Sequence, residues 1–193
     1  MLTAKFCDHL PLYRQTEIYA RNGIHLDRST LSDWVGQTAA LMRPLADAVG
    51  AHVMAAELVH ADDTTVPVLH PGRGRTKTGR LWCYVRDDRP FGGPPPPAGR
   101  YNYSPDRKAK HPHAHLAGFH GILQADGYAG YAKLYHQGVT EPACWAHVRR
   151  EFFDMHAATQ SPVAHEALQR IAALYAIEEE VCGQLPDARL RVR

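Results

Sequence analysis

Two short stretches of the sequence end in the same way, and they constrain the fold more than any other feature. Residues 57–61 and 121–125 each have the composition of a buried β-strand, and each is followed directly by an aspartate, Asp62 or Asp126. An unpaired buried charge is strongly disfavoured, so a carboxylate at the end of a core strand needs a cation beside it. Two such ends side by side predict a divalent metal between the carboxylates and, with it, a metal-dependent phosphoryl-transfer site.

The segment between the two aspartates has room for the elements that would bring them together. Strands are expected over residues 66–69, 81–85 and 101–104, followed by a helix. This order, with a helix before the last strand, allows the strand that precedes Asp62 and the strand that precedes Asp126 to lie side by side and parallel. Ligand sites of such α/β sheets lie outside the carboxyl ends of the strands. The alternative is that each aspartate only caps the turn that follows it.

Basic side chains gather in two places near the predicted site. Residues 71–79 are expected to form a hairpin loop that contains three cations and no acid, and a second basic cluster follows the third predicted strand. Such a loop is either a solvated tip or a surface that binds the phosphate backbone of DNA. The side chains predicted to contact DNA are Arg73, Arg75, Lys77, Arg80, Arg107 and Lys108.

Residues 8–50 are expected to be helical and to precede the sheet. Asn22 and Gly23 would end a first helix, and Ser29 or Thr30 would cap a second. Two linked helices resemble a DNA-binding helix-turn-helix, but a helical hairpin that packs on a neighbouring domain gives the same pattern. Another amphipathic helix is expected from residue 163 onward.

Composition excludes several classes of protein. Hydrophobic residues make up 45% of the chain and charged residues 22%, which is typical of a globular domain and argues against disorder. The net charge of +2 is too small to identify a nucleic-acid-binding protein by itself. The four cysteines have no paired spacing, which indicates free thiols, and no apolar run is long enough to span a bilayer. We therefore expect a soluble cytoplasmic protein.

Several motifs together resemble the IS66 family of bacterial insertion-sequence transposases. The resemblance implies an α/β, ribonuclease-H-like mixed sheet that is flanked by helices and preceded by a helical hairpin. It also implies an Asp-Asp-Glu triad that binds Mg²⁺ or Mn²⁺, in which Asp62 matches the first acid and Asp126 the second. Asp63 stands where the family often has a glutamate, and we expect it to be a neighbour of the site. The stretches that carry the resemblance are residues 8–15, 29–34, 60–64, 71–85, 123–131 and 144–150.

The sequence also departs from the family pattern. The family's third acid, a glutamate in an Asn-rich segment, has no counterpart here, nor has its cysteine-rich zinc-binding segment. Glu151 is a poor substitute for the missing ligand. The predicted organisation is a helical region over residues 1–50, a partial catalytic core over 51–150 and the start of a helical insertion over 151–193.

The resemblance implies a transposase that cuts and joins phosphodiesters at insertion-sequence ends, here incomplete because one acid is missing. Its expected partners are transposon-end and target DNA in the nucleoid, with self-association or other element-encoded proteins in addition and no membrane. One alternative is a non-catalytic remnant that binds DNA weakly. Another is an unrelated metal-dependent nuclease or phosphatase on a similar fold.

Overall fold

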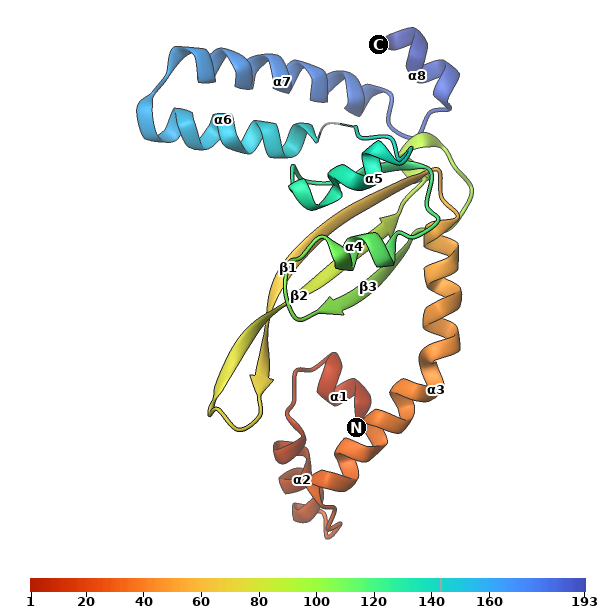
Figure 1. The fold of residues 1–193 in the computed structure, drawn as a ribbon, viewed down its shortest axis with the longest axis vertical. Coiled ribbons are helices and arrows are strands. Elements are labelled where there is room, and N and C mark those ends of the chain that lie inside the picture. The colour runs from red at the N-terminus through yellow and green to blue at the C-terminus, as the bar shows by residue number, and fades with distance from the viewer. Residues whose placement is uncertain (143) are drawn as a thin grey trace. The chain divides into compact units, whose positions relative to one another are not determined.

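A computed structural model describes residues 1–142 and 144–193 (Figure 1). The chain divides into two compact units, Met1–Ala48 and Val49–Arg193. The elements in chain order are α1 (Leu2–Phe6), α2 (Leu12–Arg21), α3 (Arg28–Met54), β1 (Leu58–His70), β2 (Arg75–Arg86), η1 (Arg89–Phe91), β3 (Ala98–Ser104), α4 (Lys110–His115), β4 (Ile122–Gln124), η2 (Ala129–Tyr131), α5 (Ala132–His136), α6 (Trp145–Thr159), α7 (Pro162–Glu180) and α8 (Pro186–Val192).

The first unit is helical, as the sequence predicts. Helix α2 ends before Asn22, and Gly23 follows with a φ of 76°, a left-handed conformation that glycine adopts without strain. Helix α3 already begins at Arg28, so the residues predicted to cap it, Ser29 and Thr30, lie inside its first turn. DNA binding by these helices stays a prediction.

The second unit is built on a four-stranded mixed sheet with the strand order β3-β2-β1-β4. Strand β1 pairs antiparallel with β2 and parallel with β4, and β2 pairs antiparallel with β3. The predicted parallel pairing of the first and fourth strands is therefore confirmed. In the parallel register Val59 lies opposite Leu123 and His60 opposite Gln124, which brings the segments that carry both aspartates to one end of the sheet.

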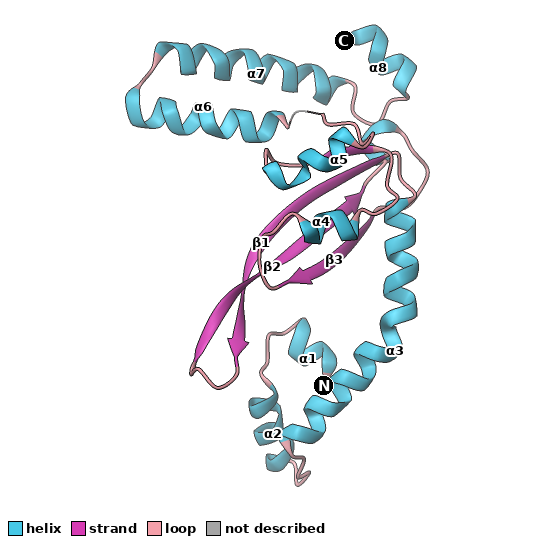
Figure 2. Ribbon diagram, in the orientation of Figure 1, coloured by secondary structure: helices cyan, strands magenta, loops and turns pink. Residues whose placement is uncertain are grey.

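Strand β1 is longer than the sequence predicts. It continues without a break from Leu58 to His70, so the strand expected over residues 66–69 is its second half. The predicted loop 71–79 is correspondingly short, because β2 already begins at Arg75. Strand β3 pairs with β2 only from Arg80 onward, so the outer part of the β1–β2 hairpin is a two-stranded ribbon that extends beyond the sheet (Figure 2).

The hydrophobic core lies on the face of the sheet that carries α4 (Figure 1). Side chains alternate between the two faces of a strand. Val59 and Ala61 on β1 therefore share the buried face with Trp82 and Tyr84 on β2. The core cluster consists of Val53, Ala56, Val59, Ala61, Trp82, Tyr84, Leu116, Phe119, Leu123, Ala125, Tyr131, Leu134 and Val139.

The chain before β4 approaches the chain before β1 very closely. A Cβ atom on Gly121 would lie 2.4 Å from the carbonyl oxygen of Glu57, a distance that no side chain tolerates. The amide of Ile122 donates to the same carbonyl at 2.7 Å. A glycine at position 121 therefore allows β4 to pair with β1.

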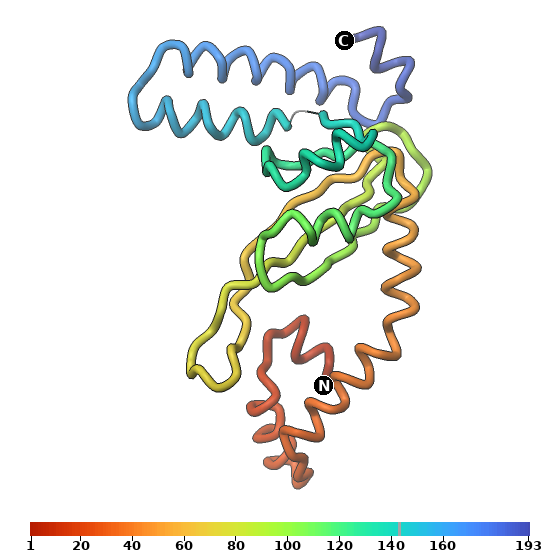
Figure 3. The backbone as a smooth tube through the Cα atoms, in the orientation of Figure 1, coloured from red at the N-terminus to blue at the C-terminus, as the bar shows by residue number. Residues whose placement is uncertain are grey.

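Helices α6 and α7 form an antiparallel hairpin (Figure 3). Ser161 caps α7, because its Oγ accepts a hydrogen bond from the amide of Ala164 at 3.4 Å. Residues 147–153 are helical throughout, as part of α6. No helix in the described part of the chain combines the length and apolar character needed to cross a membrane.

Candidate active site

The two neighbouring aspartates of β1 lie in different surroundings. Because β1 does not end at Asp62, the alternation of the strand continues past it, and Asp63 shares the buried face with Val59 and Ala61. The side chain of Asp63 is only 1% exposed. Asp62 is exposed, and its Oδ1 accepts a hydrogen bond from the backbone amide of Asp63 at 2.8 Å. The carboxylate on the core face of β1 is thus Asp63.

Asp63 and Asp126 bind the same cation, the guanidinium of Arg107. Nη2 of Arg107 lies 2.8 Å from Oδ1 of Asp63 and 2.9 Å from Oδ2 of Asp126. Nε of Arg107 also donates to Oδ1 of Asp63 at 2.9 Å. Asp63 and Asp126 therefore meet at one position, whereas Asp62, the acid predicted to pair with Asp126, accepts its hydrogen bond from the amide of Asp63.

Other contacts hold this arrangement in place. Arg80 donates from Nη1 to the second oxygen of Asp63 at 2.8 Å, so both oxygens of that carboxylate are paired. Oδ1 of Asp126 accepts from the amide of Tyr128 at 3.3 Å in the turn after β4. Burial acts to lower the pKa of Arg107, but its hydrogen bonds and charge contacts with the two aspartates outweigh burial and raise the pKa.

Tyr128 fixes the segment that carries Arg107. Its hydroxyl donates to the backbone carbonyl of Arg107, and its ring lies under the guanidinium with 4.3 Å between Cζ and the ring centroid. Ser104 anchors the same segment from the other side, because its Oγ accepts from Nε1 of Trp82 at 2.7 Å and donates to the carbonyl of Asp106 at 2.6 Å. The backbone of Arg107 is therefore held while its side chain remains 36% exposed.

An aromatic cluster lies beside the carboxylates. Tyr131 packs edge-to-face against Trp82 and Tyr128, and its buried hydroxyl has no hydrogen-bond partner among the described residues. Burial raises the pKa of Tyr131, and the negative charges of Asp126 and Asp63 add to that effect. Tyr131 is therefore a neutral hydroxyl next to the carboxylate pair.

The donor atoms of this pair suit a hard divalent cation. Mg²⁺ prefers carboxylate oxygens at about 2.0–2.1 Å, so two oxygens on one ion lie at most about 4.2 Å apart. Oδ1 of Asp63 and Oδ2 of Asp126 both contact Nη2 of Arg107, at 2.8 and 2.9 Å, so the two carboxylates face the same position. Among the residues that the structure describes, however, no group of three His, Cys, Asp or Glu side chains is arranged to hold a metal ion.

The remaining predicted site residues fall into two groups. Arg73, Arg75 and Lys77 are exposed at the far end of the β1–β2 hairpin. Lys108 is exposed next to the site, with its Nζ 3.6 Å from Asp106. Arg80 and Arg107 are instead paired with aspartates. Contact of any of these side chains with DNA stays a prediction, as does metal binding by Asp62.

The sequence does not predict the contact between Asp63 and Arg107. The sequence does contain a signal that Asp63 faces the core. Side chains alternate along a strand, so position 63 lies on the same face as the apolar Val59 and Ala61. That inference requires a strand that passes through Asp62, whereas the sequence analysis ends the strand there. Nothing local in the sequence indicates that Arg107 contacts residues on two other segments.

The sheet is mixed and flanked by helices, and its first and fourth strands are parallel. Acids follow the segment where these two strands pair. This arrangement places the chain in the ribonuclease-H-like class of α/β proteins. The chain belongs to the transposase IS66 family, whose sequence model matches residues 1–193. The expected fold class and family are thereby confirmed.

Curated relatives occur in Sinorhizobium fredii, and all three described here are named only as uncharacterized proteins. One, y4hP, is 42% identical over 210 residues, which covers 100% of this chain and 38% of the relative. A second, y4jD, is 42% identical and covers 100% of this chain and 39% of the relative. The third, y4qI, is 40% identical, and the match covers 98% of this chain and 37% of the relative. The chain thus spans less than two-fifths of the length of these relatives. No solved structure matches it.

Proposed function

We propose that this chain carries the paired carboxylates of a DNA transposase that cuts and joins phosphodiesters at insertion-sequence ends. Membership of the transposase IS66 family supports this proposal. The observation that carries it is the meeting of Asp63 and Asp126 on one cation, just beyond the segment where β1 and β4 pair in parallel. The proposed partners are transposon-end and target DNA in the nucleoid, and self-association remains part of the proposal.

In this proposal Asp126 and one aspartate of β1 hold a divalent metal, Mg²⁺ or Mn²⁺. When bound, such ions activate the attacking oxygen and stabilise the leaving one. The chain's own residues fix the carboxylates. The turn amide of Tyr128 orients Asp126, and Arg80 orients Asp63. The exposed cations Arg73 and Arg75 at the hairpin end would hold the DNA backbone by charge.

The structure supports Asp63 as the β1 ligand, whereas the family resemblance supports Asp62. Calorimetric titration of the folded chain with Mn²⁺ distinguishes them. We expect Asp126→Asn and Asp63→Asn each to weaken binding by at least about tenfold, because each removes a charged ligand, and Asp62→Asn to change it by less than about twofold.

The opposite pattern, with Asp62→Asn weakening the binding and Asp63→Asn leaving it unchanged, would return the site to the assignment made from the sequence. If none of the three substitutions affected Mn²⁺ binding, the metal-dependent proposal would fail. The chain would then be better described as a non-catalytic remnant that binds DNA weakly.

A further inference from the structure

We infer that Arg107 is a built-in competitor for the metal: its guanidinium occupies the position between Asp63 and Asp126 that a divalent cation takes, so metal binding must displace it. This inference rests on the proposed metal site and deepens it. It assigns to Arg107 the control of when the carboxylate pair is free to bind metal.

The contacts of Arg107 are those of an internal counter-ion. One nitrogen, Nη2, approaches both carboxylates within 2.9 Å, so a single positive charge serves both. Nε and Nη2 both contact Oδ1 of Asp63, and hydrogen bonds between charged groups are among the stronger polar contacts in proteins. A divalent ion at the same carboxylates would lie close to this positive charge, and the two cations repel each other. Both therefore cannot occupy the pair at once.

The surroundings also give Arg107 a route out of the site. Its backbone is tied to Tyr128 through the carbonyl, but the side chain is 36% exposed and lies over the face of the Tyr128 ring. The guanidinium can therefore swing toward solvent while its backbone stays anchored. A phosphate group at the site would attract it, because guanidinium binds phosphate in the same forked geometry as carboxylate. Arrival of DNA would in this way favour metal binding.

The test is Mn²⁺ titration by calorimetry of the full chain and of Arg107→Gln, which keeps a side chain of similar length without the charge. We expect Arg107→Gln to bind Mn²⁺ at least about fivefold more tightly, since removing the competitor frees the binding-competent state. The matched control is Lys110→Gln, which removes the same charge from the exposed first residue of α4. Its affinity should remain within about twofold of the parent chain.

The outcomes separate this inference from the proposed function. If Asp126→Asn abolishes Mn²⁺ binding and Arg107→Gln fails to tighten it, Arg107 is not a competitor although the metal site stands. If Asp126→Asn has no effect, the metal site itself is wrong.

Thermal unfolding checks that each variant folds. Should Arg107→Gln unfold, Arg107→Met replaces it, because methionine keeps an unbranched side chain and also lacks the charge. Unchanged affinity in that variant would also overturn the inference.

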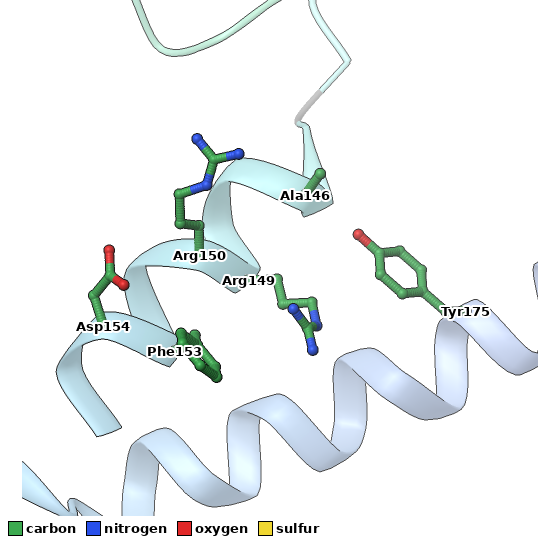
Figure 4. A pocket seen from close by; sticks show the side chains of 6 residues that line it. All are labelled: Ala146, Arg149, Arg150, Phe153, Asp154 and Tyr175. Atoms are coloured by element: carbon green, nitrogen blue, oxygen red, sulfur yellow. The ribbon is translucent and has the colours of Figure 1, made fainter. Parts of the chain in front are cut away.

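A second inference concerns an open groove of about 640 Å³ on the α6–α7 hairpin (Figure 4). We propose that this groove binds a single strand of DNA, again within the proposed transposase function. Arg149 and Arg150 are exposed on α6, and neither forms an ion pair with a carboxylate in the described residues. Phe153 and Tyr175 line the same groove with 53% and 40% of their surfaces exposed.

This combination of side chains matches the chemistry of a nucleic-acid strand. Unpaired guanidinium groups bind backbone phosphates, and exposed aromatic rings provide faces on which bases stack. Figure 4 shows that Tyr175 points from α7 toward α6, while Phe153 and Arg149 occupy the space between the helices. Asp154 is the single acid in the lining, so the groove carries a net positive charge.

Fluorescence anisotropy with a labelled oligothymidylate tests the groove. The double substitution Arg149→Ala, Arg150→Ala should reduce the salt dependence of binding by about 1.4 log units per log unit of salt, since each lost phosphate contact on a single strand contributes about 0.7. Phe153→Ala should weaken binding at least about fivefold without changing that slope. Arg170→Ala is the control, because Glu166 already pairs with Arg170 at 2.6 Å. An unchanged slope in the double variant would overturn the proposal.

Discussion

Asp62 and Asp63 are identical side chains on adjacent residues, and the strand alone makes them different. Side chains alternate between the two faces of β1, so Asp62 is exposed, whereas only 1% of the Asp63 side chain is exposed. A buried carboxylate is stable only when it is paired, and Arg80 and Arg107 supply both cations. The sequence shows two acids side by side. Only the direction in which each side chain points decides which one can act together with Asp126.

The hydroxyl groups of Tyr131 and Tyr84 should contribute differently to the stability of the fold. The buried hydroxyl of Tyr131 has no partner in the described part of the chain, whereas the hydroxyl of Tyr84 shares a hydrogen bond with Nδ1 of His115 at 3.0 Å. Removing an unsatisfied buried hydroxyl is neutral or stabilising, and removing a paired one costs about 1 kcal/mol. We expect Tyr131→Phe to preserve or raise the free energy of unfolding in urea and Tyr84→Phe to lower it. Equal losses in the two variants would contradict this.

His115 makes stability depend on pH. Burial, with smaller contributions from the charges of His111 and Arg100, lowers the pKa of His115 from 6.5 to about 4. The unfolded chain therefore binds a proton on this residue before the folded chain does. The stabilisation is complete above pH 6.5 and is lost as the pH falls from there toward 4.

The measurement is urea unfolding at several pH values across that window. His115→Phe removes the titrating group, so its stability should fall less between pH 7 and pH 5 than that of the parent chain. Substituting the exposed His120 by Gln provides the control and should leave the pH dependence unchanged. A parent chain and a His115→Phe variant with parallel pH profiles would show that His115 does not titrate in this way.

At the scale of elements, the sequence predicts the existence of the strands better than their lengths. The period-two pattern identifies β1, β2, β3 and β4, and the helix between the third and fourth strands explains the parallel pairing. The end of β1 was misplaced because the charged pair Asp62-Asp63 breaks the apolar pattern. Cross-strand pairing continues through these positions, with Asp63 opposite Trp82 and Val66 opposite Gly79. The polar residues at positions 62 and 63 therefore lead to a predicted end of β1 that is too early.

The β1–β2 hairpin carries a prediction of its own. Its outer half is a two-stranded ribbon, and Arg73, Arg75 and Lys77 are exposed there. If these side chains contact DNA phosphates, replacing all three by alanine should lower the salt dependence of duplex binding by about 2–3 log units per log unit of salt. Filter binding at several salt concentrations measures the slope. Arg170→Ala on α7 serves as the control, and a triple variant with the parental slope would exclude the hairpin from the DNA interface.

The site is only partly predictable from the sequence, because it forms only when the whole chain has folded. Asp63, Arg107 and Asp126 lie on three separate segments, and the fold brings them together through the parallel pairing of β1 and β4. Hydrophobic periodicity predicts that pairing, so it could predict a pair of acids at one edge. It does not predict a cation from the loop after β3, because that contact depends on where Ser104 and Tyr128 fix the loop.

Two carboxylates meet in the site, and no third metal-binding side chain joins them within the described residues. A site with two acids can bind one ion but holds a second loosely, and strand transfer uses both. We therefore expect the isolated chain to bind Mn²⁺ yet to show no detectable joining of a DNA end to target DNA.

A longer chain tests the same point in the opposite direction. The relative y4hP matches this chain over 38% of its own length and therefore has further residues that could complete the site. A fusion in which this chain replaces the matched region of y4hP should gain Mn²⁺-dependent joining of a 3′-hydroxyl end to a plasmid target, measured on gels. The same fusion carrying Asp126→Asn should lose that activity, because the shared carboxylate is needed whichever segment supplies the third acid. Efficient end-specific joining by the unfused chain would show instead that two carboxylates suffice, and the incomplete-site interpretation would have to be abandoned.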